Sequence, residues 1–507
     1  MHEGTSQRKL WLVPLVGLKK RRTGRPKVSF GMLPLVVYNN KVIRNYSFFE
    51  DKRETQIPAE VMEEIDLEKY KIGLVSLGCD KNRVDSEIML GMLKNRYEIT
   101  DEPKEADIII VNTCGFIESA KQESIDTILE MAQYKKEYNC KLLMATGCLT
   151  QRYGEELLSI MPELDIILGV NNYGFLDAYV DKFIKTREKI VALDFKDEGI
   201  NEGDRLITTG FGQTAYLRIS EGCSNNCTYC IIPKIRGKYR SREMEKILKE
   251  ANALAENGTS EIIVIAQDTT RYGTDLYGRK ALPELLGKLK EIEGIKWIRV
   301  LYLYPEEFDE ELIREIRDNE KVVKYLDLPI QHISDSVLKR MARRTKKEDI
   351  IALLERLRKE IPGIILRTSL IVGFPQETDE EFEELYAFVK EIKFDKLGVF
   401  SYSKEEGTPA GLMKGQIRKE VKQKRLDLIM TEQQKISRGI NEWKIGQTYE
   451  VLIEGLGEDG YYGRSAEMAP EIDGLVYINS EKELVAGSYV MVRITDALEY
   501  DIIGEVI

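Results

Sequence analysis

Between residues 71 and about 185, short apolar runs alternate with amphipathic stretches. The apolar runs are KIGLVSLGC (71–79), ADIIIVNTCGF (106–116), KLLMATGC (141–148) and LDIILGV (164–170). The stretches between them, such as ESAKQESIDTILEMAQYKK (118–136), show helical periodicity. Buried strands joined by helices are typical of a doubly wound parallel sheet. We therefore expect an N-terminal α/β domain over residues 71–187.

A second series of strands and helices begins near residue 213. Its apolar runs are TAYLRIS (214–220), EIIVIAQD (261–268), WIRVLYLY (297–304), KYLDLPIQH (324–332), GIILRTSLIVGF (363–374) and KLGVFSYS (396–403). Helical sequence fills each interval, as in residues 242–258. Six such units predict a partial (βα)6 barrel over residues 209–440, which the helical run 418–444 closes.

The two ends of the chain differ from this pattern. Residues 445–507 are β-rich and punctuated by glycine, which predicts a small all-β barrel over 441–507. Near the N-terminus, the apolar run 10–18 contains Pro14 and precedes the basic run 19–27. A signal peptide would have its charges before the apolar run. Residues 1–70 are either a basic arm for RNA or a ribosome, or a poorly ordered extension outside the core fold; we favour the extension.

Composition narrows the class of protein. The 507 residues are 43% hydrophobic and 32% charged, as in an ordinary globular protein, and the net charge of −11 argues against a general nucleic-acid binder. Seven cysteines without a secretory pattern favour a reducing cytoplasm over a disulfide framework. No apolar run approaches the roughly 20 residues that a membrane span needs.

Three cysteines occupy equivalent places in the first domain. Cys79, Cys114 and Cys148 each follow one of the first three strands, at the sheet edge where ligands of open α/β sheets bind. The three thiols are therefore expected to converge. Buried structural cysteine is the alternative for each of them, and it is the interpretation we adopt for Cys140.

The remaining cysteines lie in CSNNCTYC (223–230), in the loop after the first barrel strand. A structural zinc site is closed by four ligands, commonly in paired CxxC units. No second pair is present, and the only histidines are His2 and His332. An iron–sulfur cluster suits thiolates better, and three of them on four irons would leave one iron open.

CxxxCxxC in this position resembles the signature of the radical S-adenosylmethionine (SAM) superfamily. With the upstream cysteines, residues 71–507 resemble the methylthiotransferases, which combine an α/β domain, a radical SAM barrel and a TRAM barrel. The resemblance implies SAM and two [4Fe–4S] clusters as cofactors. Cys223, Cys227 and Cys230 would hold the cluster that cleaves SAM to a 5′-deoxyadenosyl radical. Cys79, Cys114 and Cys148 would hold an auxiliary cluster that carries the sulfur to be inserted.

Local motifs favour one branch of this family. VSLGCDKNRVDSE (75–87) resembles the LGCxKNxVDSE of the RimO-type branch, with Asp80 where proline is common, whereas the tRNA branch typically shows GCQMN. Residues 220–242, 328–345, 400–410 and 463–478 resemble RimO as well. The implied reaction is methylthiolation at the β-carbon of an aspartate in small-subunit ribosomal protein S-12. A second SAM would supply the methyl group, and a flavodoxin or ferredoxin would donate electrons.

The charge of the C-terminal domain helps to distinguish a ribosomal-protein substrate from a tRNA substrate. Residues 445–507 contain 13 Asp and Glu but 3 Lys and Arg, a net charge of −10. A domain that grips tRNA should be basic, whereas an acidic one suits a basic ribosomal protein. An acidic surface also serves solubility. A tRNA adenosine methylthiotransferase is thus the alternative we favour less. A zinc- or cluster-stabilised binding protein without radical chemistry is the third.

Further residues are candidates for the SAM cleft. Tyr229 lies within the cysteine motif, where the superfamily places an aromatic residue near the adenine. Four others lie at or near the ends of barrel strands: Gln267, Asp268, Gln331 and Gly373. His332 follows the fourth strand in the same way. Each of these strand-end residues could instead serve packing or a turn.

Overall fold

The computed structural model describes residues 10–11, 70–194, 200–208, 212–458 and 460–507. Most of the expected extension 1–70 lies outside the described residues. Strand β1 (Leu10–Trp11) is the exception, because it pairs antiparallel with Ser76 and Val75. The fold thus takes a two-residue strand from a segment that we expected to stand apart from it.

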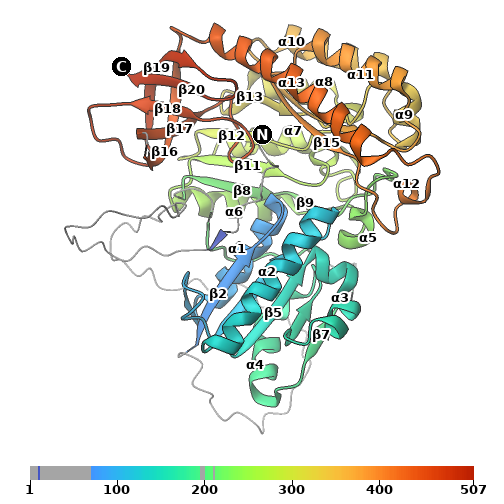
Figure 1. Ribbon diagram of the computed structural model, residues 1–507. Helices are drawn as coiled ribbons and strands as arrows, with labels where there is room; N and C mark the ends of the chain where they lie inside the picture. The colour runs from blue at the N-terminus through green and yellow to red at the C-terminus, as the bar shows by residue number, and fades with distance from the viewer. Residues whose placement is uncertain (1–9, 12–69, 195–199, 209–211, 459) are drawn as a thin grey trace.

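The first unit is a parallel sheet with helices on both faces (Figure 1). The strands run in the order β1-β2-β4-β5-β6-β7, with β3 beside β2. Their bounds are β2 (Lys71–Ser76), β3 (Glu98–Ile99), β4 (Ile108–Thr113), β5 (Leu142–Gly147), β6 (Ile166–Leu168) and β7 (Ile190–Ala192). The helices are α1 (Asp80–Leu93), α2 (Glu118–Glu137), α3 (Cys148–Ile160), η2 (Tyr173–Phe175) and α4 (Leu176–Thr186).

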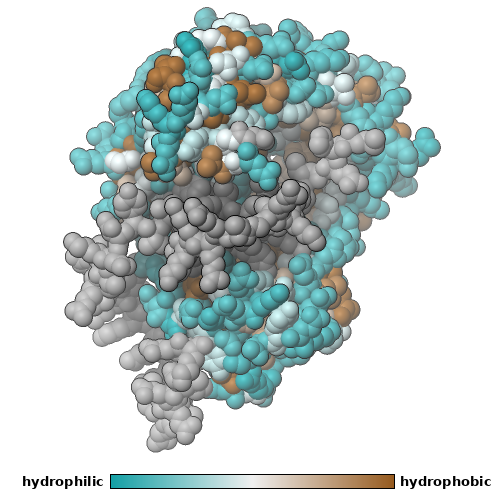
Figure 2. Space-filling view, turned by 60° about the vertical axis from the view of Figure 1, so that its left-hand side comes forward, coloured by the Kyte–Doolittle hydropathy of each residue, from teal (hydrophilic) through white to brown (hydrophobic). Residues whose placement is uncertain are grey.

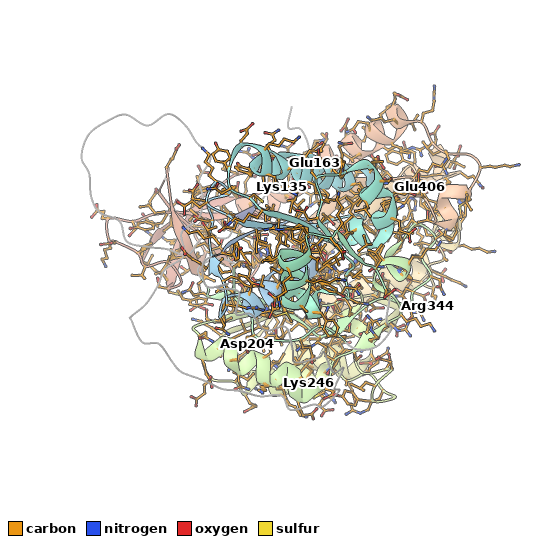
Figure 3. The ribbon with its side chains drawn as sticks, turned by 90° about the horizontal axis from the view of Figure 1, so that it is seen from below. Lys135, Glu163, Asp204, Lys246, Arg344 and Glu406 are labelled. Carbon is orange, nitrogen blue, oxygen red and sulfur yellow. The ribbon has the colours of Figure 1, made fainter. Side chains whose placement is uncertain are left out.

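Two apolar cores explain this layering. Side chains alternate across a strand, so Ile108 and Ile110 pack with α1 and α4 while Ile109 and Val111 pack with α2 and α3. Viewed from below, Lys135 of α2 lies beside Glu163 (Figure 3), and its ammonium donates to the Glu163 carbonyl at 2.9 Å. The predicted doubly wound domain is confirmed.

The second unit is an open sheet of six parallel strands in the order β15-β14-β13-β12-β11-β8. Their bounds are β8 (Thr214–Arg218), β11 (Glu261–Ile265), β12 (Trp297–Val300), β13 (Val322–Asp327), β14 (Ile365–Val372) and β15 (Lys396–Ser401). The main helices are α6 (Met244–Glu256), α7 (Leu282–Lys290), α8 (Glu310–Asp318), α10 (Lys347–Glu360), α11 (Asp379–Ile392) and α13 (Lys419–Trp443). The edge strands β8 and β15 do not pair, so the predicted partial (βα)6 barrel is confirmed.

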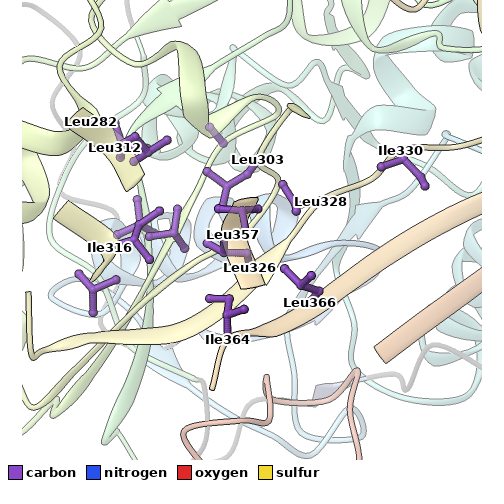
Figure 4. Packing of buried hydrophobic residues seen from close by; sticks show 14 of the residues in the cluster. Leu282, Leu303, Leu312, Ile316, Leu326, Leu328, Ile330, Leu357, Ile364 and Leu366 are labelled. Atoms are coloured by element: carbon purple, nitrogen blue, oxygen red, sulfur yellow. The ribbon is translucent and has the colours of Figure 1, made fainter. Parts of the chain in front are cut away.

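Short elements complete this unit: β9 (Ser220–Glu221), α5 (Ile232–Arg236), β10 (Arg240–Ser241), η3 (Thr269–Arg271), η4 (Pro305–Glu307), α9 (Asp335–Arg340) and α12 (Pro409–Leu412). Its core lies between the sheet and the outer helices, where Leu326 and Leu366 of the strands meet Leu312 and Leu357 of the helices (Figure 4).

All six barrel strands end before their apolar runs do, and two of them end much earlier. Strand β12 ends at Val300 rather than Tyr304, and β13 ends at Asp327 rather than His332. Tyr302 and Gln331 have φ angles of 62° and 71°, which strand geometry does not allow. The apolar run continues past each strand because the following loop is buried.

The C-terminal unit is a closed five-stranded barrel, as predicted. Its strands are β16 (Thr448–Gly457), β17 (Gly460–Ser465), β18 (Val476–Asn479), β19 (Tyr489–Ala497) and β20 (Ile502–Val506), in the order β16-β17-β18-β20-β19. On the face shown in Figure 2, hydrophilic residues dominate and hydrophobic ones form small separate patches. Among the described helices, none has the length and apolar character to cross a membrane.

A buried ion cluster joins the C-terminal barrel to the six-stranded sheet. Glu261 begins β11 and is fully buried, 3.0 Å from Arg299 Nε and 2.7 Å from Arg464 of β17. Burial opposes its charge, but Arg464 and Arg299 hold the pKa of Glu261 at about 2. The same interface has an exposed pair, Lys296 with Glu450 at 2.5 Å.

Replacing Glu261 by Gln should lower the free energy of unfolding by about 3–5 kcal/mol, because two buried guanidinium groups lose their shared carboxylate. The matched change Glu450→Gln removes an exposed pair and should cost about 1 kcal/mol or less. Urea denaturation of both variants provides the comparison. Equal losses would show that the buried cluster contributes no more than a surface pair.

Candidate metal-cluster site

The three N-terminal cysteines meet at one edge of the first sheet. Cys79 precedes α1, Cys114 follows β4 directly, and Cys148 begins α3 immediately after β5. Two glycines allow the close approach: a Cβ on Gly78 would lie 2.8 Å from Cys114 Cβ, and one on Gly115 would lie 2.8 Å from the Cys148 carbonyl. Cys79, Cys114 and Cys148 thus lie at the same edge of the sheet, and we name them the auxiliary triad; their role as cluster ligands stays a prediction.

The electrostatics of the auxiliary triad favour the binding of a positively charged group. Burial raises the pKa of Cys114 far above its ordinary value, and the thiols of Cys148 and Cys79 raise it further. Burial also raises the pKa of Cys148 to about 11, although the Arg236 guanidinium opposes that rise. Three thiolates cannot be held together here without positive charge. A metal cluster supplies such charge, and thiolates are the usual ligands of iron–sulfur clusters.

The second set, Cys223, Cys227 and Cys230, lies in the loop between β9 and α5, and we name it the loop triad. The amide N–H groups of Asn225 and Ile232 donate to the sulfurs of Cys223 and Cys230, each at 3.4 Å. Burial raises the pKa of Cys223 to about 11 and that of Cys230 still further. Amides directed at sulfur stabilise thiolates, so this loop also fits an iron–sulfur cluster.

Among the described residues, no three His, Cys, Asp or Glu side chains are grouped so as to hold a metal ion, and this applies to both triads. The choice between zinc and an iron–sulfur cluster therefore rests on ligand chemistry: three thiolates suit a cluster, whereas structural zinc usually takes four ligands. The loop triad is fixed by its backbone. Thr228 donates through its amide to the Met341 carbonyl at 3.0 Å and through its hydroxyl to the Arg340 carbonyl at 2.8 Å.

Helix α5 links the two triads. Cys148 packs in one apolar cluster with Ile231 and Ile235, and Ile231 directly follows Cys230. Helices α3 and α5 are in contact, although they belong to different units. The two triads therefore lie on neighbouring segments of the structure.

An ion network beside α5 ties the two units together. Arg236, the last residue of α5, donates to Asn82 Oδ1 at 2.5 Å and to Asp85 Oδ2 and Glu221 Oε2 at 3.0 Å each. Arg218 of β8 also pairs with Asp85 and Glu221. All four charged side chains are at least 95% buried. Arg236 thus bridges the first helix of the N-terminal unit and the strand that precedes the loop triad.

A second polar contact joins α1 to the barrel. The Lys81 ammonium lies 3.0 Å from the ring centroid of Tyr302, the residue with positive φ beyond β12. The Tyr302 hydroxyl donates to Asp80 Oδ2 at 2.8 Å, and its amide donates to Asp327 Oδ2 at 3.2 Å. A non-glycine residue at positive φ costs about 1–3 kcal/mol, which the surrounding contacts must offset.

Two of the predicted SAM-cleft residues contact side chains in or just before the cysteine loop. Asp268 accepts from Asn225 at 2.7 Å and from Thr270 at 2.6 Å, and burial raises its pKa to about 6. Gln267 donates to Glu221 at 2.8 Å, while its buried Oε1 has no hydrogen-bond partner among the described residues. That oxygen could accept from a bound ligand, so the predicted role of Gln267 stays a prediction with geometric support.

The other cleft candidates have evident packing roles. Gln331 bridges to Leu370, and its side chain donates to the Pro329 carbonyl at 3.2 Å. Gly373 lies against Lys422 of α13, whose Cγ would be 2.3 Å from an added Cβ. Tyr229 packs beside Phe374 and Tyr402 in a small apolar cluster. A role for these three in binding SAM stays a prediction.

His332 and Cys140 are buried in separate places. Cys140 lies in the core beneath α2 and donates to the Leu142 carbonyl at 3.3 Å, in agreement with the structural interpretation. The Nδ1 atom of His332 accepts from the Ser334 amide at 3.0 Å, and its Nε2 is 3.9 Å from Glu377. Burial lowers the pKa of His332 to about 3.

The buried histidine should make stability depend on pH. Its pKa in the folded protein is below the ordinary 6.5, so its contribution is complete above pH 6.5 and is lost as the pH falls toward 3. Between pH 7 and 5.5 the parent should lose about 1 kcal/mol more than His332→Asn, whose oxygen can still accept from Ser334. Urea unfolding at both pH values measures this. Identical losses would mean that His332 does not titrate as its burial requires.

Sequence reasoning missed the polar residues that join the units. Asn82, Asp85, Glu221 and Arg236 all lie within motifs that were noted, but only as markers of a family. The segment KNRVDSE (81–87) carried a usable signal. Its charged residues are spread over every face of the predicted helix, so whichever face is buried must bring charged side chains into the protein.

Comparison with family models agrees with this architecture. Residues 217–389 match the radical SAM superfamily, residues 445–507 match the TRAM domain, and residues 71–169 match a family described as uncharacterized protein family UPF0004. The fold and the two cysteine triads thus define a radical SAM enzyme with a C-terminal TRAM domain.

Curated relatives place the chain more narrowly. Proteins called ribosomal protein uS12 methylthiotransferase RimO from Clostridium acetobutylicum and Clostridium perfringens are 59% and 62% identical to it over 440 and 441 residues. These alignments cover 87% and 86% of this chain and 99% and 98% of those proteins. The chain belongs to the RimO family of methylthiotransferases.

Solved structures show a weaker likeness. The radical SAM methyltransferase TsrM from Kitasatospora setae has a TM-score of 0.49 and 14% identity, covering 68% of this chain and 77% of that one. This likeness adds nothing to the family assignment.

Proposed function

We propose that this chain methylthiolates the β-carbon of an aspartate in small-subunit ribosomal protein S-12. The observation that carries the proposal is the packing of Cys148, from the auxiliary triad, against Ile231 and Ile235, which follow the loop triad in the sequence. One triad serves radical formation and the other serves sulfur delivery, which is the division of labour that this reaction needs. The family of the chain and the names of its relatives support the same substrate.

The protein residues have distinct parts in this proposal. Cys223, Cys227 and Cys230 hold one [4Fe–4S] cluster, and Cys79, Cys114 and Cys148 hold the other. When bound, these clusters supply the electron that cleaves SAM and the sulfur that is inserted. Asp268 fixes the first cluster loop through Asn225.

Arg236 and Gln267 complete this assignment. Arg236 offsets the negative charge of the auxiliary thiolates, because its guanidinium interacts with Cys148, Cys79 and Cys114. Gln267 offers its unpaired oxygen to SAM. Both residues contact Glu221, so the two cluster sites share one buried carboxylate.

The tRNA alternative is not favoured. The relatives reported above carry the name of a ribosomal-protein enzyme, and the TRAM domain has a net charge of −10. Phosphate binding would require basic residues there. A cytoplasmic location and a flavodoxin or ferredoxin donor complete the proposal, since both follow from chemistry on a ribosomal protein by a reduced iron–sulfur enzyme.

Anaerobic reconstitution with iron and sulfide should load about eight irons per chain, four for each triad. Replacing Cys223, Cys227 and Cys230 together by alanine should leave about four, and replacing the auxiliary triad should also leave about four. Cys140→Ala is the matched control and should retain about eight. Iron analysis measures all four proteins.

The reconstituted parent should then add a methylthio group to S-12 and not to isolated tRNA, as mass spectrometry of both would show. Modification of tRNA alone would replace the proposed substrate. A parent that loads four irons, all lost with the loop triad, would remove the auxiliary cluster and the sulfur delivery that depends on it.

A further inference from the structure

Residues 80–87 of α1 form a polar segment inside the protein. Each of three charged side chains in it meets a partner from another part of the chain. Arg83 pairs with Glu471 of the TRAM domain at 2.7 Å, Asp85 pairs with Arg236, and Glu87 pairs with Arg205. Buried charges are ordinarily compensated in this way.

Lys81 is the exception in this segment. Its side chain is only 6% exposed, yet its ammonium forms no ion pair or hydrogen bond with any residue that the structure describes. It rests on the face of Tyr302 at 3.0 Å. Burial lowers the pKa of Lys81, and an aromatic ring stabilises a cation less than a carboxylate does. A carboxylate would therefore stabilise the Lys81 ammonium more than the Tyr302 ring does.

The position of Lys81 points to the reacting groups. It lies two residues after Cys79 of the auxiliary triad, and Cys79 interacts electrostatically with both Lys81 and Tyr302. Tyr302 follows β12 at the carboxyl edge of the barrel, where parallel α/β barrels carry their chemistry. The unpaired ammonium is therefore situated between the auxiliary triad and the catalytic edge.

We propose that Lys81 binds the side-chain carboxylate of the target aspartate and thereby selects an acidic residue as substrate. This inference rests on the proposed function. An aspartate whose β-carbon receives the methylthio group carries its carboxylate on that same carbon. Holding the carboxylate at Lys81 places the β-carbon beside the auxiliary triad. The contact with Tyr302 keeps the ammonium in place while no substrate is bound.

Neighbouring cations are less suited to this task. Arg367 already pairs with Asp327 at 2.6 Å, and Arg83 and Arg236 have the partners named above. An incoming carboxylate would have to displace those partners, whereas at Lys81 it meets an ammonium without one.

The test is a double-mutant cycle on binding, with holoenzyme carrying both clusters and no SAM or reductant. Parent and Lys81→Met enzymes are each titrated with S-12 and with S-12 in which the target aspartate is asparagine. The parent should bind the aspartate form about 10- to 100-fold more tightly, the range for a charge-assisted hydrogen bond. Lys81→Met should bind the two forms equally. Lys94→Met, an exposed lysine at the far end of α1, should behave as the parent.

Four results would overturn the inference. The first is a Lys81→Met enzyme that keeps the preference for aspartate. The second is a parent that shows no such preference, a result that needs no enzyme variant. The third is a Lys81→Met protein that loads only about four irons, because Lys81 would then support the auxiliary cluster itself. If affinity for SAM falls in Lys81→Met while S-12 binding does not, the carboxylate bound is that of SAM.

Failure of the proposed function would look different. In that case the parent holoenzyme would add no methylthio group to S-12 in the presence of SAM and reductant. If the parent modifies S-12 but the cycle shows no coupling, the function stands and the role of Lys81 does not.

Discussion

The structure depends on one buried ion network, in which Arg236 bridges Asp85 and Glu221 at 3.0 Å each. These charges could not be buried singly, because an unpaired carboxylate or guanidinium inside a protein costs several kcal/mol. The N-terminal unit contributes Asp85 and the barrel contributes the others. Neither unit can shift against the other without leaving one of these buried charges unpaired, so the network fixes the position of the two units relative to each other.

The network also explains why hydrophobic contact alone would not serve. Apolar surfaces slide with little change in free energy, since the hydrophobic effect is not directional. Guanidinium–carboxylate pairs accept a narrow geometry. Two clusters that must act on one substrate need that precision, and the apolar contact of Cys148 with Ile231 and Ile235 gains its register from Arg236, at the end of the same helix.

Much of the fold could be predicted from sequence because it follows from periodicity. The strands 108–113 and 365–372 and the helix 419–443 are long, regular and bounded by polar residues. The triad Cys79, Cys114 and Cys148 was also predictable, since neighbouring parallel strands end at the same edge. The N-terminal strand Leu10–Trp11 was not, because two residues carry no periodic signal.

The polar contacts between the units could not be predicted from the periodicity of the sequence, for a different reason. Whether Asn82 contacts solvent or Arg236 depends on residues 154 positions apart, and no local pattern reports such a pairing. Tyr302 shows the same limit: its apolar run predicted a strand, whereas its hydroxyl and amide are drawn to Asp80 and Asp327. Tertiary hydrogen bonds overrode local preference there.

Helix α1 shows how one element can organise several units. Its residues from Lys81 to Leu90 are all buried, although five of the first seven have charged or amide side chains, a mixture typical of a solvent-exposed helix. Asn82 donates to the carbonyls of Leu77 and Thr113, which fixes the edge of the first sheet. The following residues of α1 contact the TRAM domain through Arg83 and the barrel through Asp85. A helix buried on all sides needs a hydrogen-bond or ion-pair partner for each of its polar side chains. The polar residues of such a helix therefore depend on the units that surround it. A charged side chain on such a helix that has no ion-pair partner among the described residues, as is the case for Lys81, points to a ligand, because the neighbouring charged side chains of the same segment all have partners within the protein.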